Sequence, residues 1–215
     1  MRSPLAEQER ERLVVAMLPD VAFDGWGRAS LRHAARRTGI PVAEALALFP
    51  RGGADMVAAF SRWADHEMLQ LLAAVAAEAL EPVGLSARIA LALSLRFEVL
   101  MPWREAVRRS LAVLAMPQNG PLGLRLLYET VDAMWRGVGD HASDFSFYTK
   151  RASLAAVQAA ATLYWLEDRS PDMAETRAFI DRRLADLHRI GGMRERLSAA
   201  VEALPNPLRV LRPSR

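Results

Sequence analysis

The chain has 215 residues, of which 52% are hydrophobic and 25% are charged, a balance typical of an ordered globular protein. The formal net charge is only +3, and the absence of cysteine excludes disulfides, thiolate nucleophiles and cysteine metal sites. No segment shows sustained alternation of apolar and polar residues, which argues against strands. We therefore predict an all-α protein.

Proline and glycine divide the chain into Ala-, Leu- and Arg-rich segments that have helical patterns. The predicted helices are Leu5–Leu18, Ala29–Thr38, Val42–Phe49, Ala54–Leu80, Ser86–Leu100, Trp103–Ala115, Leu122–Val138, Phe145–Glu167, Met173–Ile190 and Met193–Ala203. After them, Pro205 and Pro207 predict an irregular tail, because proline interrupts a helix.

The second and third predicted helices form a helix-turn-helix pattern. Small alanines share one face of the first, and Gly39 supplies the corner between them. This layout resembles the N-terminal part of TetR-type regulators. The stretch "PVAEALALF", however, contains none of the Arg, Lys, Asn or hydroxyl side chains that contact base edges, and residues 1–50 hold seven Arg against six acids. We expect the architecture without DNA binding. The arginines before it could touch phosphates, but a solvated helix face is favoured for Arg28, Arg32, Arg36 and Arg37.

The sequence offers no catalytic or metal-binding set. Its four histidines are scattered without metal-ligand spacing, and there is no nucleophile elbow, phosphate loop or dinucleotide fingerprint. Asp65, His66 and Glu67 occupy adjacent positions, which point in different directions on a helix, so we interpret them as a solvated face. We predict that the protein is not an enzyme and has no metal or organic cofactor.

The segment Ala152–Leu166 is apolar nearly all round, with only Ser153, Gln158 and Thr162 as polar residues. A helix of this kind lies in the middle of a bundle or lines a cavity. Two interpretations stay open: a tightly packed alanine core, or the wall of an apolar pocket between helices. Apolar faces in Ala87–Leu100 and Leu122–Trp135 would supply the neighbouring walls.

Leu111–Leu187 contains the motifs "MPQN", "VDAMW", "GD…SDF…YTKRA" and "LEDRSPDM…T…F…RL…D" in order. With these motifs the chain resembles the coenzyme Q biosynthesis protein nine (Coq-nine) family over most of Phe23–Ile190. The resemblance implies a TetR-like homodimer with an apolar pocket for an isoprenoid quinone or other lipid. It also implies a supporting role in ubiquinone synthesis, in which lipid-tailed intermediates are presented to a membrane-associated di-iron demethoxyubiquinone hydroxylase.

The same resemblance implies a surface patch that binds the hydroxylase, where the predicted helices containing "VDAMW" and "DFSFYTKR" meet. Its residues are Asp132, Met134, Asp144, Phe147 and Tyr148, with Phe147 where the family often has tryptophan. Exposed aromatic and Met side chains beside acids suit such an interface. For Asp144 a plain helix cap is the alternative. Lys150 and Arg151 are expected to be solvated or to meet acids of the partner.

Candidate lipid contacts follow from the helices expected to wall the pocket. They are Leu127, Val131, Leu154, Val157, Leu163 and Trp165, and an ordinary core position is the alternative for each.

We predict three regions: a helix-turn-helix unit at 1–52, a helical lipid-binding and dimerisation domain at 53–190, and an amphipathic segment with an irregular tail at 191–215. The last region has one apolar stripe, which either contacts a membrane surface or docks on the protein itself. The N-terminus lacks the features of a signal or transit peptide, and we expect a cytoplasmic protein peripherally attached to the inner membrane. The alternative function is a ligand-responsive TetR-type transcriptional regulator.

Overall fold

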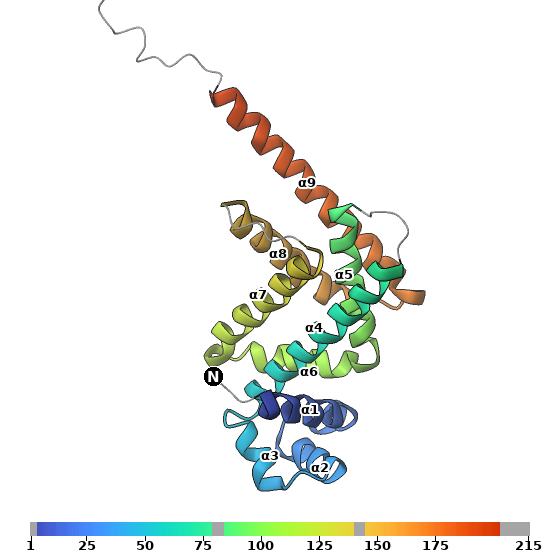
Figure 1. Ribbon diagram of the computed structural model, residues 1–215, viewed down its shortest axis with the longest axis vertical. Coiled ribbons are helices and arrows are strands. Elements are labelled where there is room, and N and C mark those ends of the chain that lie inside the picture. Colours follow the sequence, from blue (N-terminus) through green and yellow to red (C-terminus); the bar gives the residue numbers. More distant parts are fainter. Residues whose placement is uncertain (1–3, 79–83, 140–144, 203–215) are drawn as a thin grey trace, which may run out of the picture.

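The computed structural model describes residues 4–78, 84–139 and 145–202, without the side chains at 4, 78, 145–150, 188 and 190–202. Within these ranges the secondary structure consists of nine α-helices and three short 3-10 turns, with no strand (Figure 1). The predicted all-α class is confirmed.

The helices follow the predicted order closely. They are α1 Pro4–Asp24, α2 Arg28–Thr38, α3 Val42–Leu48, α4 Gly53–Glu78, α5 Leu85–Leu100, α6 Arg104–Leu114, α7 Gly120–Gly137, α8 Phe145–Glu167 and α9 Ala174–Glu202. Two predictions were wrong. α1 continues past Pro19, whose ring is exposed while Leu18 and Val21 on either side are buried. α9 passes without a break through the two glycines at which separate helices were expected.

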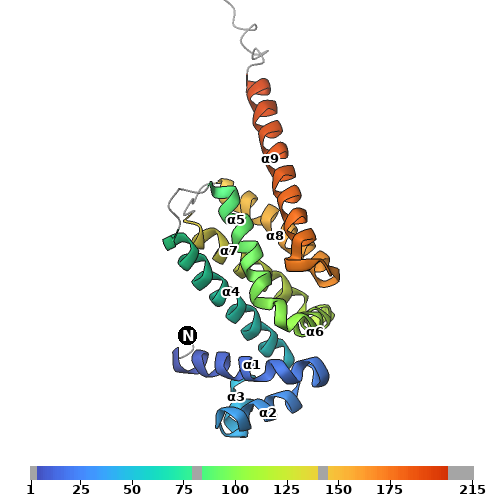
Figure 2. The same ribbon diagram turned by 90° about the vertical axis from the view of Figure 1, so that its right-hand side faces the viewer.

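Helices α1 to α3 form the predicted helix-turn-helix unit at one end of the molecule (Figures 1 and 2). Leu31, Ala34 and Ala35 on α2 are fully buried, and Gly39 ends the helix with a φ of 73° that favours glycine. As predicted, Arg28, Arg32, Arg36 and Arg37 are exposed, and Arg37 is paired with Asp20 rather than free.

A buried arginine connects this unit to the rest of the protein. Arg10 of α1 is 2% exposed; it donates hydrogen bonds to the Leu48 carbonyl at the end of α3 at 2.7 Å and to the Asp55 carbonyl on α4 at 3.3 Å. Trp26 adds a hydrogen bond of 3.2 Å from its indole N–H to the Ala106 carbonyl on α6. Gly53, the first residue of α4, packs against the Trp26 backbone. A side chain is excluded at this position, because a Cβ would lie 2.7 Å from the Trp26 carbonyl oxygen.

Helices α4 to α9 form the larger unit. Its core includes Trp165 of α8, which is fully buried and stacks on Phe97 of α5 with ring centroids 5.3 Å apart. The long α4 runs from the helix-turn-helix unit along this bundle, and the later part of α9 extends away from the other helices in both views (Figures 1 and 2).

The "LEDRSPDM" motif turns the chain from α8 into α9. The Asp168 carboxylate accepts hydrogen bonds from the backbone N–H of Ser170 at 2.7 Å and of Thr176 at 2.9 Å, and from both hydroxyls. Burial alone raises the pKa of Asp168, but these hydrogen bonds outweigh it and lower the pKa to about 2. The ionised carboxylate therefore holds the start of α9.

Replacing Asp168 by Asn is expected to lower the free energy of unfolding by roughly 2 kcal/mol at pH 7, because Asn cannot accept on both sides. The folded pKa lies below the ordinary value of 3.8, so this stabilisation is full above pH 5 and is lost as the pH falls toward about 2. Chemical denaturation between pH 7 and pH 2 measures it.

The matched control is Asp172→Asn, an exposed acid of the same turn whose φ of 50° also suits Asn. It should leave the unfolding free energy unchanged. Equal stability of Asp168→Asn and the unmodified protein at pH 7 would contradict the role given to Asp168.

Candidate functional site

A cavity of about 350 Å³ lies between five helices of the larger unit, α4 to α8. Most of its wall is apolar. The lining residues are Val57, Phe60, Ser61, Arg96, Leu100, Val107, Ser110, Leu111, Leu114, Gly123, Leu126, Leu127, Thr130, Gln158, Ala159, Thr162 and Leu163. Cavities between helices with apolar walls and a few polar groups are common small-molecule sites.

The cavity has an exposed side and a buried side. Ala159 and Leu163 of α8 are exposed, the latter by 63%, and Leu127 of α7 is half-buried. By contrast, Phe60 and Gln158 are each 3% exposed. The opening therefore lies beside α8, and the deeper part faces α4 and α5.

A buried polar cluster forms part of the deeper wall. Arg96 of α5 donates to the Asp65 carboxylate at 2.7 Å and to the Ser61 hydroxyl at 3.3 Å. Thr130 of α7 donates to the same carboxylate, its oxygen lying 3.0 and 2.9 Å from the two carboxylate oxygens. Ser61, Arg96 and Thr130 line the cavity, and Asp65 lies behind them. Their polar atoms are largely used within the protein.

The prediction that Asp65 belongs to a solvated face was wrong. Asp65 is only 7% exposed, whereas the neighbouring His66 is exposed and contacts Gln70. Burial raises the pKa of Asp65, and the Arg96 charge and the Thr130 hydroxyl act in the opposite direction by stabilising the carboxylate. These two partners make the burial of an acid tolerable.

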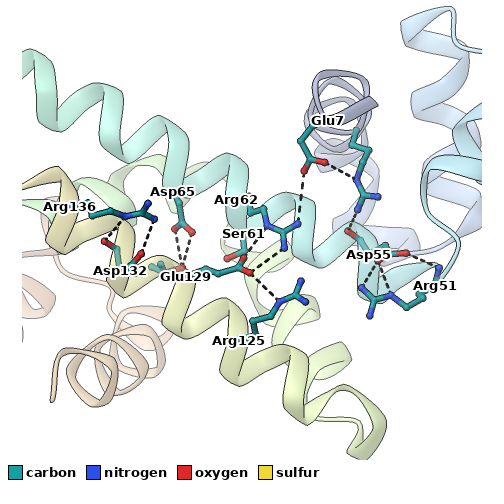
Figure 3. A network of polar contacts seen from close by, with 12 residues as sticks. Glu7, Arg51, Asp55, Ser61, Arg62, Asp65, Arg125, Glu129, Asp132 and Arg136 are labelled. Carbon is teal, nitrogen blue, oxygen red and sulfur yellow. Dashed lines mark hydrogen bonds and ion pairs between the residues drawn. The ribbon is translucent and has the colours of Figure 1, made fainter. Parts of the chain in front are cut away.

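A second, more exposed ion-pair chain joins α1, α4 and α7. Arg62 of α4 lies between two acids: its Nε is 3.0 Å from Oε2 of Glu129 on α7, and its Nη1 is 4.0 Å from Oε1 of Glu7 on α1 (Figure 3). Arg125 Nε lies 3.1 Å from the other carboxylate oxygen of Glu129. Figure 3 shows Ser61 and Asp65 on the same stretch of α4, facing α7. These contacts hold α4 against α7, two of the cavity's walls.

Of the six predicted lipid contacts, two lie at this cavity. Leu127 and Leu163 line it, one from each of the two helices expected to do so. The other four, Val131, Leu154, Val157 and Trp165, are buried and are not among the lining residues. Both interpretations of the alanine-rich helix hold in part, because Ala161 is fully buried in the core while Ala159 lines the cavity.

The lining residues from α4, α5 and α6 were missed by sequence reasoning. Phe60, Arg96 and Val107, for example, stand in ordinary amphipathic helices, where nothing distinguishes a cavity wall from a core position. The polar residues Ser153, Gln158 and Thr162 within an apolar helix were a usable signal, since two of the three line the cavity.

The predicted partner patch is only partly within the described chain. Asp132 is partly exposed and pairs with Arg151 and Arg136, each at 2.8 Å. Met134 is fully buried, so the expectation of an exposed Met was wrong; its position on α7 faces the core. Arg151, expected to be solvated or at an interface, is 3% exposed and lies against Asp132.

The other patch residues lie outside the description: Asp144 entirely, and Phe147 and Tyr148 in their side chains, as does the side chain of Lys150. The patch itself stays a prediction.

Among the described residues, no three His, Asp or Glu side chains are grouped so that they could hold a metal ion. No described helix is both long and apolar enough to cross a membrane. The absence of catalysis and of a cofactor stays a prediction.

Comparison with known proteins shows which family the chain resembles. Residues 120–191, which include α7, α8 and the first part of α9, match the COQ9 family. Over 204 residues, or 92% of this chain, the sequence is 29% identical to the human mitochondrial ubiquinone biosynthesis protein COQ9 and 30% identical to the protein of that name from Rattus norvegicus. The chain is a relative of the COQ9 proteins. It spans 63% and 64% of the length of these two relatives.

The COQ9 resemblance includes a shorter match to the probable ubiquinone biosynthesis protein coq9 of Dictyostelium discoideum, 36% identical over 100 residues, 46% of this chain and 33% of that protein. In structure, the chain is similar to the TetR transcriptional regulator from Nitrosomonas europaea. The TM-score is 0.63 at 17% sequence identity, covering 83% of this chain and 97% of the other. The predicted TetR-like fold is confirmed.

Proposed function

We propose that this COQ9 relative is a non-catalytic lipid-binding accessory protein of ubiquinone biosynthesis. It binds an isoprenoid quinone intermediate and presents it to a membrane-associated di-iron demethoxyubiquinone hydroxylase. The observation that carries the proposal is the apolar cavity lined by the five helices α4 to α8. Two of these helices, α7 and α8, belong to the region that matches the COQ9 family. The relatives compared above are all named as ubiquinone biosynthesis proteins.

The cavity supports an isoprenoid ligand through its shape and chemistry. Its volume of about 350 Å³ lies within the range of small-molecule sites. Leucine and valine side chains from α4, α5, α6 and α7 supply apolar contacts. Because the opening lies beside α8, a tail longer than the cavity can continue out of it past Leu163.

The purified protein is expected to copurify with an isoprenoid quinone or a related lipid, because the cavity wall is apolar. Native mass spectrometry, followed by organic extraction and identification of the lipid, is the test. A protein that is empty and also fails to bind added short isoprenoids would contradict the proposed function.

Partner binding is the second part of the proposal, and the predicted patch is its basis. The variant Asp144→Lys with Tyr148→Ala is expected to weaken binding to the hydroxylase at least tenfold without unfolding the protein, because interface aromatics and charges dominate such contacts. Surface plasmon resonance with the hydroxylase measures it. Asp181→Lys, an exposed acid on α9, is the charge-change control. An unchanged affinity of the double variant would remove the patch assignment.

We further propose a homodimer that contacts membranes peripherally. The support for membrane contact is the extension of α9 away from the bundle, together with the apolar stripe Met193, Leu197, Ala200, Val201 and Leu204 in the sequence. An amphipathic helix of this kind can lie in the headgroup region.

The alternative, a TetR-type regulator, rests on the fold similarity alone. On α3 the exposed side chains are Ala43, Glu44 and Ala47, which offer no donor to a base edge. Specific binding to a palindromic duplex at low salt would revive this alternative.

A further inference from the structure

Gln158 is a buried polar residue at the cavity whose acceptor is unused. It is 3% exposed, lines the cavity from α8, and donates from Nε2 to the Thr162 hydroxyl at 3.3 Å. The amide oxygen Oε1 has no hydrogen-bond partner. Among the cavity-lining residues in the described part of the chain, it is the one buried side-chain atom without a partner.

The orientation of this amide follows from its neighbour. The Thr162 hydroxyl has a single hydrogen, which it donates to the Gln158 backbone carbonyl at 2.8 Å. Toward the Gln158 side chain it can therefore only accept, which requires Nε2 on that side and leaves Oε1 on the other. The unused group is thus an acceptor, and what it lacks is a donor.

No polar group of the described cavity wall donates to Gln158 Oε1. Arg96 donates to Asp65 and Ser61, and Thr130 donates to Asp65. The Ser110 hydroxyl donates its hydrogen bond to the Ala106 carbonyl of its own helix at 2.8 Å. Buried acceptors are nearly always hydrogen-bonded, so an unpaired one in a cavity wall points to a donor on the ligand.

We propose that Gln158 Oε1 accepts a hydrogen bond from a hydroxyl group of the ligand, and that the cavity prefers a phenol or quinol with an apolar chain to the matching quinone. The inference rests on the proposed lipid-binding function. A quinone carbonyl can accept from Nε2 but leaves Oε1 unpaired, whereas a hydroxyl pairs it. The polar ring end then lies beside Gln158, and the chain runs along the apolar wall.

The test compares two probes that differ in the donor only: para-nonylphenol and the matching nonylfluorobenzene. Isothermal titration of the full chain should show the phenol binding about five- to tenfold more tightly, as expected for one net hydrogen bond. In Gln158→Met, which keeps the side-chain length but loses the acceptor, both probes should bind with the affinity of the fluorinated one. Ser110→Ala, which removes a lining hydroxyl already bonded within α6, should keep the preference.

The possible outcomes distinguish a failure of the role given to Gln158 from a failure of the lipid-binding proposal. Equal binding of the two probes to the unmodified protein overturns the role of Gln158 while leaving the lipid-binding cavity in place. A preference that survives in Gln158→Met overturns it as well. Failure of both probes to bind removes the lipid-binding proposal and this inference together. Should Gln158→Met not fold, the two probes on the unmodified chain still decide.

Discussion

Replacing Asp65 by Asn is expected to lower the free energy of unfolding by about 3–5 kcal/mol, the largest stability effect we predict. Asp65 and Arg96 are each less than 10% exposed, and their charged atoms lie 2.7 Å apart. Asn leaves the Arg96 guanidinium buried without its counter-charge, and desolvation makes such a charge costly. Denaturant titration followed by circular dichroism measures the change.

Two controls test whether burial is the cause. Arg177 and Glu98 also lie 2.7 Å apart, but their side chains are 48% and 40% exposed, so Glu98→Gln should cost less than about 1 kcal/mol. The double variant Asp65→Leu with Arg96→Met removes both charges and should be more stable than Asp65→Asn. A cost for Asp65→Asn no larger than that for Glu98→Gln would show that the buried pair is not important.

Replacing Ala159 by tryptophan is expected to weaken isoprenoid binding at least tenfold, the largest effect we predict on the proposed function. Ala159 lines the cavity on its exposed side, so an indole there can fill the opening without entering the packed core. Tenfold corresponds to about 1.4 kcal/mol, less than the burial of one leucine-sized side chain. Titration with farnesol, a short isoprenoid alcohol, measures the affinity.

Ala160 supplies the matched control. It is the next residue on α8, is also exposed, and does not line the cavity. Ala160→Trp should therefore bind farnesol as the unmodified protein does, while both variants keep the same helical content. If Ala159→Trp binds farnesol normally, the ligand does not enter through this opening.

The helices could be predicted from sequence because their signals are local. Proline and glycine mark most ends, and α8 was predicted with the bounds it has, Phe145–Glu167. The failures at Pro19 and at the two glycines of α9 have one cause. These residues weaken a helix by a limited amount, and the rest of the helix can outweigh them.

The candidate site was harder to predict. The apolar, alanine-rich α8 left a packed core and a cavity wall as alternatives. Leu127 of α7 and Leu163 of α8, predicted because their helices were expected to wall a pocket, line the cavity. Val131 and Trp165 have the same apolar character but pack into the core. Which apolar residue faces a cavity depends on how neighbouring helices cross, and no pattern within one helix contains that information.

By itself the sequence determined the helical class, the helix-turn-helix without base-reading side chains, and the relationship to the COQ9 proteins, because each depends on residue types in order along the chain. Only the tertiary structure decided which polar groups are buried. Asp65 lies 31 residues from Arg96 and 65 residues from Thr130 along the chain, and its neighbours in the sequence predicted a solvated helix face. A buried charge needs a hydrogen-bonded or charged partner, and for Asp65 packing brings that partner from distant parts of the chain.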